Sequence, residues 1–137
     1  MLKITRLADY SVLILCCFQN KKLTAKEISN KTGLGMATVN KILSLLVKAK
    51  VLIPLRGAKG GYLPSKNLRD ISIKDIIEAV EGPVAITRCL EIKDKSCNLL
   101  DLCITKNVWN QVNNSVMRTL QSIKINDITE NNRSFID

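Results

Sequence analysis

The sequence predicts a mainly α-helical fold with one small β-hairpin, followed by a long C-terminal helix. Apolar residues make up 46% of the 137 residues but aromatic residues only 4%, a composition that suits a helical core of aliphatic side chains. Most segments repeat their apolar residues at helical spacing, whereas residues 51–63 contain two short β-prone runs around a glycine-rich turn. The length is sufficient for one domain and an association element.

Three helices are predicted before the hairpin. Residues 5–18 are apolar almost all round and begin with Thr5, a suitable capping residue. Thr24 and Glu27 have the spacing of a capping box, which begins a short second helix. Glycines interrupt the chain after residue 31, and a third helix follows over residues 36–50. The second and third helices with their glycine-bearing turn match a helix-turn-helix.

The polar side of the third helix and the tip of the hairpin contain the candidate DNA contacts. Thr38, Asn40 and Lys41 lie on the helix, where Asn can read adenine and Lys guanine in the major groove. Arg56 and Lys59 lie between the tip glycines and could reach phosphates or the minor groove. Any helical hairpin resembles a helix-turn-helix, but a basic β-hairpin directly after it is typical of a winged helix.

The charge distribution favours the same interpretation. Residues 1–70 contain thirteen Lys and Arg against three acidic side chains, a net charge of +10, while residues 71–137 have eight against nine, a net charge of −1. A basic half joined to a neutral half is the pattern expected of a nucleic-acid-binding module with a second element attached. Charge alone would equally fit a lysine-rich surface, so the motifs decide.

The second half of the chain predicts an association element. A helix over residues 72–81 ends at a Gly-Pro pair, and residues 99–123 repeat valine or leucine every four residues, from Val108 to Leu120. A helix of about 25 residues would be roughly 35 Å long and would leave its apolar stripe uncovered, so we expect a homodimer. The alternative is that this helix packs back on its own domain. The expected domains are a winged helix-turn-helix (1–82), a cysteine-bearing loop (83–104), a dimerisation helix (105–125) and a flexible tail (126–137).

Three cysteines lie within fifteen residues, in a sequence that has no histidine. Cys89, Cys97 and Cys103 are spaced too widely for a typical zinc site, and their spacing fits a loop around an iron–sulfur cluster. Three unrelated cysteines are the alternative. Cys16 and Cys17 differ, because they lie in the apolar first helix and are expected in the core.

These features together resemble the IscR/NsrR family of winged-helix transcriptional regulators, which carry an iron–sulfur cluster. The resemblance rests on the wing sequence from Arg56 to Tyr62, the preceding helix-turn-helix and the three cysteines, and it extends from residue 1 to about residue 129. Residues 2–10 look most like the branch that regulates the SUF cluster-assembly system. The resemblance implies a homodimer, a double-stranded DNA operator, and Cys89, Cys97 and Cys103 as cluster ligands.

The fourth ligand implied by the resemblance is Asp9. In the IscR type a histidine stands three positions after the third cysteine, where this sequence has Lys106. In the NsrR type an acidic residue in the first helix of the other subunit completes the site, and Asp9 is the matching position. A [2Fe–2S] cluster is favoured and a [4Fe–4S] cluster is the alternative. The expected function is regulation of SUF-type genes, with a nitric-oxide-sensing or redox-sensing repressor as the alternative.

Other classes of protein are disfavoured. The apolar run at residues 12–18 is too short to span a membrane and lacks a cleavage site for a signal peptide, so we expect a cytoplasmic protein without membrane contact. A thiol oxidoreductase is disfavoured because the sequence has neither a Cys-x-x-Cys motif nor a histidine base. No enzymatic activity and no small-molecule substrate are expected. A DNA-binding regulator with redox-active or zinc-binding cysteines, and no cluster, is the second alternative.

Overall fold

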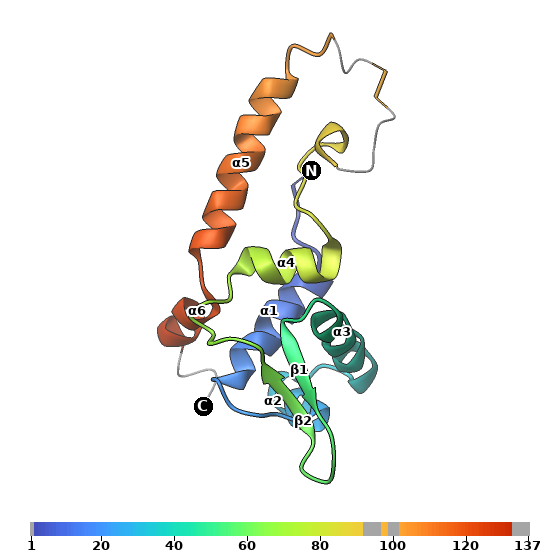
Figure 1. The fold of residues 1–137 in the computed structure, drawn as a ribbon, viewed down its shortest axis with the longest axis vertical. Coiled ribbons are helices and arrows are strands. Elements are labelled where there is room, and N and C mark those ends of the chain that lie inside the picture. Colours follow the sequence, from blue (N-terminus) through green and yellow to red (C-terminus); the bar gives the residue numbers. More distant parts are fainter. Residues whose placement is uncertain (1, 92–96, 99–101, 133–137) are drawn as a thin grey trace.

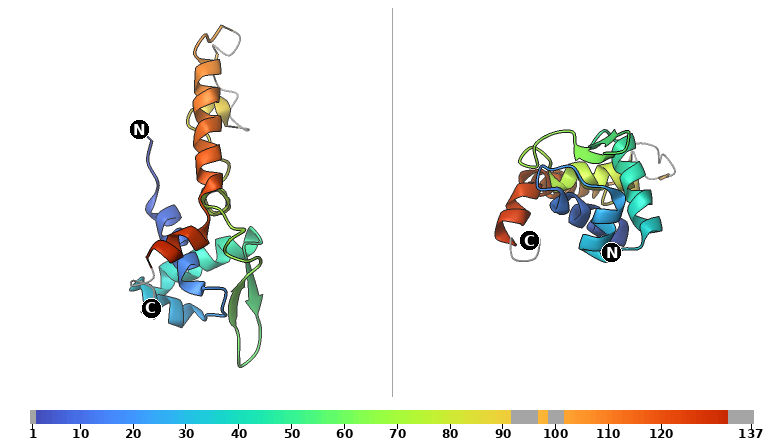
Figure 2. Two further views of the ribbon diagram at one scale, coloured as in Figure 1. Left: turned by 90° about the vertical axis from the view of Figure 1, so that its left-hand side faces the viewer. Right: turned by 90° about the horizontal axis from the view of Figure 1, so that it is seen from below.

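The computed structural model describes residues 2–91, 97–98 and 102–132. Helices α1–α4 and the β-hairpin pack into one body, from which α5 extends, as two perpendicular views show (Figures 1 and 2). The elements are α1 (Arg6–Phe18), α2 (Ala25–Thr32), α3 (Met36–Lys48), β1 (Leu52–Leu55), β2 (Gly61–Pro64), α4 (Ile73–Glu81), a 3₁₀ turn η1 (Arg88–Leu90), α5 (Lys106–Ser122) and α6 (Ile125–Asn131). The mainly α fold with a hairpin wing is confirmed.

Local capping explains where the helices of this body begin. The Thr5 hydroxyl accepts a hydrogen bond from the Ala8 N–H at 3.1 Å, as expected for an N-cap. Thr24 and Glu27 form the predicted capping box, and the Glu27 carboxylate accepts the Thr24 N–H at 2.7 Å. Helix α4 begins with a second capping box, which Ser72 shares with Asp75.

The core lies among α1, α2, α3 and α4, with α6 packed against α1. Helix α1 contributes its apolar face, including both cysteines, so the prediction that Cys16 and Cys17 are core residues is confirmed. Burial, with a smaller contribution from neighbouring Cys17, raises the pKa of Cys16 to about 12. Its thiol is therefore inert at neutral pH. The fully buried side chains of α1 and α3 include Ile14, Leu15, Phe18, Val39, Ile42, Leu43 and Leu46.

The wing is a two-stranded antiparallel hairpin extended by one further pairing. Strands β1 and β2 pair from Leu52 opposite Pro64 to Leu55 opposite Gly61. Leu23, in the connection between α1 and α2, exchanges two backbone hydrogen bonds with Tyr62, at 2.7 and 3.1 Å. Two backbone bonds at one position restrain the hairpin against the helical body.

Helix α5 is shorter than predicted at both ends. Residues 102–105 form turns rather than a helix, and the Lys106 N–H donates to the Cys103 carbonyl at the helix start. At the other end Ile123 has extended backbone, because its carbonyl accepts the Ile73 N–H at 3.0 Å. The helix has 17 residues, about 26 Å at 1.5 Å per residue. Residues 99–101, where the prediction began the helix, lie outside the described residues.

The predicted flexible tail is wrong for residues 126–131, which belong to α6. Ile125 is fully buried, and its N–H donates to the Ile71 carbonyl at 2.9 Å. Helix α6 packs against α1, so the chain returns from α5 to the first helix (Figure 1). The segment is polar overall, and one buried isoleucine and a backbone bridge hold it in place. The remainder of the predicted tail, residues 133–137, lies outside the described residues.

Within the described residues, every helix falls short of the combined length and apolarity needed to cross a membrane.

Candidate functional site

The exposed face of α3 contains the side chains predicted to contact DNA. Val39, Ile42 and Leu43 point into the core, which turns the opposite side of the helix outward. Asn40 and Lys41 are exposed there, and Thr38 is partly buried. The N-cap of α3 is Gly35, which has no side chain that could accept a hydrogen bond. The first N–H groups of α3 are therefore not satisfied by an N-cap side chain. Uncapped N–H groups at a helix start can bind a phosphate.

The wing places Arg56 and Lys59 at its tip, where both side chains are exposed. The tip turn requires glycine, because a Cβ on Gly60 would lie 2.8 Å from the Leu55 carbonyl oxygen and 3.0 Å from that of Gly57. Gly57 itself has φ of +99°, in the left-handed region. The hairpin tip lies beyond one end of the helical body (Figure 1), where it can extend along a DNA groove next to α3.

One cation near the wing was missed in the sequence. The Lys22 ammonium donates a hydrogen bond to the Lys59 carbonyl, and the Lys22 stem lies next to Gly61. In the sequence, residues 19–22 look like a simple polar connection between two helices. Its place beside the wing follows from the Leu23–Tyr62 pairing, a long-range contact that no local pattern announces.

The three cysteines of the loop are free thiols outside the winged-helix core. Cys89 lies in η1, and Cys103 lies three residues before α5. Cys97 lies between stretches outside the described residues. All three side chains are partly exposed, in contrast to Cys16 and Cys17. The loop therefore presents three accessible sulfur atoms between α4 and α5.

Two of these thiols lie within hydrogen-bond distance of threonine hydroxyls. The Thr87 Oγ1 lies 3.1 Å from Cys89 Sγ, and the Thr105 Oγ1 lies 3.3 Å from Cys103 Sγ. The hydrogen bond from the Thr105 hydroxyl, followed by that from its backbone, lowers the pKa of Cys103, and the nearby Lys106 charge has a smaller effect in the same direction. Hydrogen bonds and positive charge favour the thiolate, the form that binds metals.

The donor set fits an iron–sulfur cluster in its chemistry. Iron in such clusters takes thiolate ligands, and these three thiols are accessible and free of disulfides. Among the described residues, no three Cys, Asp or Glu side chains are grouped around one point that could hold a single metal ion. The ligands of an iron–sulfur cluster bind different iron atoms, so the cysteines need not all surround a single point.

Asp9 lies in the first turn of α1, and its side chain is exposed. The same end of α1 is tied to the end of α4, because the Thr5 hydroxyl donates to the Glu81 carboxylate. The Asp9 carboxylate is therefore accessible to a ligand or to a second chain. Its predicted role as fourth ligand stays a prediction.

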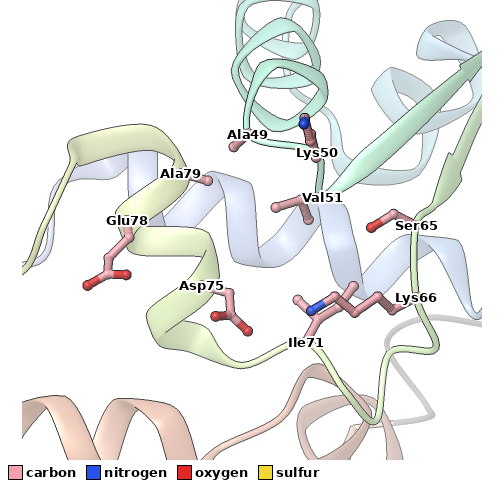
Figure 3. Close-up of a pocket in the computed structure, with 9 residues that line it drawn as sticks. All are labelled: Ala49, Lys50, Val51, Ser65, Lys66, Ile71, Asp75, Glu78 and Ala79. Carbon is pink, nitrogen blue, oxygen red and sulfur yellow. The ribbon is translucent and has the colours of Figure 1, made fainter.

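A groove of about 430 Å³ separates the end of α3 from α4 (Figure 3). Its lining includes two cations, Lys50 and Lys66, and two carboxylates, Asp75 and Glu78. Asp75 caps α4, and Glu78 pairs with Lys74 at 3.7 Å. None of the predicted DNA or cluster residues lines this groove, so it is separate from both.

Comparison with known proteins decides the family. A family model described as "Rrf2: Iron-dependent Transcriptional regulator" matches residues 4–131. This chain belongs to the Rrf2 family. Its similarity to IscR-type regulators, predicted from the sequence, is confirmed by a 30% identity over 105 residues to the HTH-type transcriptional regulator IscR of Pectobacterium atrosepticum, covering 77% of this chain and 63% of the relative.

A second curated relative also matches over most of this chain. The ORF2 regulator of Azotobacter vinelandii is 26% identical over 110 residues, which are 80% of this chain and 66% of that protein. The chain thus spans just under two thirds of the length of these curated relatives. They are transcriptional regulators and not enzymes, as predicted.

Solved structures share the fold. The T. potens IscR structure has a TM-score of 0.68 at 26% identity, covering 95% of this chain and 88% of that one. The structure of CymR, the global cysteine regulator of B. subtilis, has a TM-score of 0.72 at 24% identity, covering 95% and 98%. The predicted winged-helix fold is therefore confirmed.

Proposed function

We propose that this Rrf2 protein is a homodimeric DNA-binding transcriptional regulator whose operator affinity is controlled by an iron–sulfur cluster. The observation that carries the proposal is the position of three accessible thiols on the segment between α4 and α5, in a chain that matches a family of iron-dependent regulators. Cys89, Cys97 and Cys103 bind the cluster, and Asp9 of a second copy completes it. A [2Fe–2S] cluster is favoured over [4Fe–4S].

DNA binding in this proposal uses two elements. Helix α3 enters the major groove with Thr38, Asn40 and Lys41, and the wing holds phosphates or the minor groove with Arg56 and Lys59. The support is that Asn40, Lys41, Arg56 and Lys59 are all exposed, on elements that lie side by side in one body (Figure 1). The operator lies upstream of SUF-type cluster-assembly genes, and the protein acts in the cytoplasm.

Two exposed apolar side chains in the first turn of α5 support the dimer. Val108 and Trp109 are 54% and 43% exposed, large values for apolar side chains in a helix. The partner that covers these side chains is a second copy of α5, because a two-fold symmetric dimer matches a two-fold symmetric operator. Sedimentation at micromolar protein should give twice the chain mass, and a Trp109→Lys variant should sediment as a monomer.

Cluster binding is tested on protein purified without oxygen. Iron and acid-labile sulfide should be present in equal amounts, and the visible spectrum distinguishes [2Fe–2S] from [4Fe–4S]. DNA recovered by selection from a random duplex pool then serves as the probe. Apo and holo protein must bind that probe with different affinity at the same salt concentration; equal affinity would contradict cluster control.

The role of Asp9 can be tested against a matched control variant, because the basic half of the chain contains another exposed acidic residue. Asp9→Ala should weaken the cluster or alter its spectrum while the fold is kept, because it removes a carboxylate ligand. Asp70→Ala removes another exposed acid and should leave the spectrum unchanged. An unchanged spectrum and cluster lifetime in Asp9→Ala would show that the fourth ligand lies elsewhere.

A second candidate function is direct thiol-based redox regulation without a cluster. The observation that favours it is the lowered pKa of Cys103, because an accessible thiolate is also the oxidisable form of cysteine. Oxidation of metal-free protein would then change DNA affinity. The iron and sulfide assays separate the two functions, since only the first needs either element.

A further inference from the structure

Asn113 is the one side chain of α5 that is buried among the described residues. It is 6% exposed, in the middle of a helix whose apolar residues at Val108 and Trp109 are largely exposed. Asparagine is a poor residue for a helix interior, and burying its carboxamide costs free energy unless both ends are hydrogen-bonded. Its location therefore needs a specific partner.

The partner is the backbone of the segment that leads to Cys89. The Ile86 N–H donates to Asn113 Oδ1 at 3.0 Å, and Asn113 Nδ2 donates to the Val84 carbonyl at 3.4 Å. Nδ2 also lies 3.3 Å from the Met117 sulfur. The carboxamide thus bonds to a carbonyl and to the N–H two residues later, as a neighbouring β-strand would do. Two bonds of this kind define both the position and the register of the segment.

The two segments that these bonds join each lead to one of the cysteines. Asn113 lies eight residues after Thr105, which is about 12 Å along the helix, and Thr105 holds Cys103. Ile86 lies three residues before Cys89, and three residues reach up to roughly 10 Å. The segment from α4 to η1 rises beside α5 toward its first turn (Figure 1). A slip of two residues would move Cys89 by about 6 to 7 Å.

We infer that Asn113 is a positioning residue that sets the place of Cys89 along α5, and so its distance from Cys103. The inference deepens the proposed function, because these are two of its three cluster ligands. Asn113 itself lies ten residues after Cys103 and binds no iron. Its role is to fix the register of the α4–η1 segment along α5, and with it the distance between the two sulfur atoms.

The test uses the full chain and two measurements. In metal-free protein carrying Cys97→Ser, a short bismaleimide should link Cys89 to Cys103 within one chain, quantified by peptide mass spectrometry. Cys16 and Cys17 are buried and do not compete. Asn113→Leu should slow this cross-link about fivefold or more, because it lowers the effective concentration of one thiol near the other. Asn114→Leu, the exposed neighbour on the same helix, should match the parent.

The second measurement is the loss of iron from the cluster-loaded chain, without Cys97→Ser, to an added chelator. Asn113→Leu should accelerate that loss about tenfold, the effect expected when a residue supporting metal ligands is removed. If the parent chain holds no iron, the proposed function fails, while the cross-linking rate still decides the role of Asn113. An unchanged cross-linking rate in a folded Asn113→Leu variant would overturn the inference.

A variant on the other partner covers the case in which Asn113→Leu does not fold. Ile86→Pro removes the N–H that Asn113 accepts and leaves α5 intact. Ala85→Pro is the matched control, since the Ala85 N–H makes no hydrogen bond to any of the residues that the structure describes. Slower cross-linking in Ile86→Pro than in Ala85→Pro supports the inference, and equal rates overturn it.

Discussion

Replacing Ile125 with alanine should strongly destabilise the protein, because this residue anchors α6. Ile125 is fully buried, and the change removes three carbon atoms, worth about 2.4 kcal/mol at 0.8 kcal/mol each. The cavity left behind adds to this cost, so we expect a loss of about 3 kcal/mol in the free energy of unfolding. For a chain of this length that corresponds to a fall of roughly 10 °C in the melting temperature.

The assay is thermal unfolding of metal-free protein followed by far-ultraviolet circular dichroism. Protein concentration is held constant, because association changes the apparent stability. Ile104→Ala makes the same chemical change at a side chain that is 91% exposed and should cost less than about 0.5 kcal/mol. A melting temperature for Ile125→Ala within a degree of that control would refute the packing of α6 against α1.

Three further predictions concern the DNA interface and the thiols. Gly60→Ala should weaken DNA binding with little loss of global stability, because the added methyl meets the Leu55 carbonyl at 2.8 Å and forces the wing tip to shift. Lys59→Ala should reduce the slope of log affinity against log salt by about 0.9, the value for one lost phosphate contact. Thr105→Val should move the alkylation of Cys103 to higher pH, because removing the hydroxyl bond that lowers this pKa delays thiolate formation.

Each of these three predictions has a control measurement on this protein. Ala58→Gly, in the same turn, should keep the affinity that Gly60→Ala loses; equal affinities would contradict the close-approach argument. Lys74→Ala removes a lysine paired with Glu78 and should leave the salt slope unchanged, so a similar fall in both would show that Lys59 acts through overall charge. For Cys103, identical pH profiles in the parent and Thr105→Val would exclude the hydroxyl as the cause.

The sequence was most informative where structure is controlled locally. Capping boxes depend on two side chains three residues apart, so Thr24 and Glu27 correctly indicated the start of α2. The same holds for the wing, because its turn depends on glycines within a few positions of each other. These local signals, together with the apolar spacing of α1 and α3, were enough to predict a winged helix.

Long-range hydrogen bonds decided what the sequence did not show. The bonds between residues 71–73 and 123–125 end α5 and begin α6, and no pattern within residues 123–131 indicates them. Similarly, Asn113 looks like an ordinary polar position of a helix until the Ile86 backbone lies against it.

By itself, the sequence determined the class of fold, the helix-turn-helix and hairpin elements, and the set of three clustered cysteines, because these depend on composition and on the spacing of a few residues. Only the tertiary structure decided that the chain returns from α5 to α1 through α6, that Lys22 lies beside the wing, and that the segment before Cys89 bonds to Asn113 of α5. The physical reason is that backbone N–H and carbonyl groups are the same at every position. Which of them pair across the chain depends on the packing of the whole molecule.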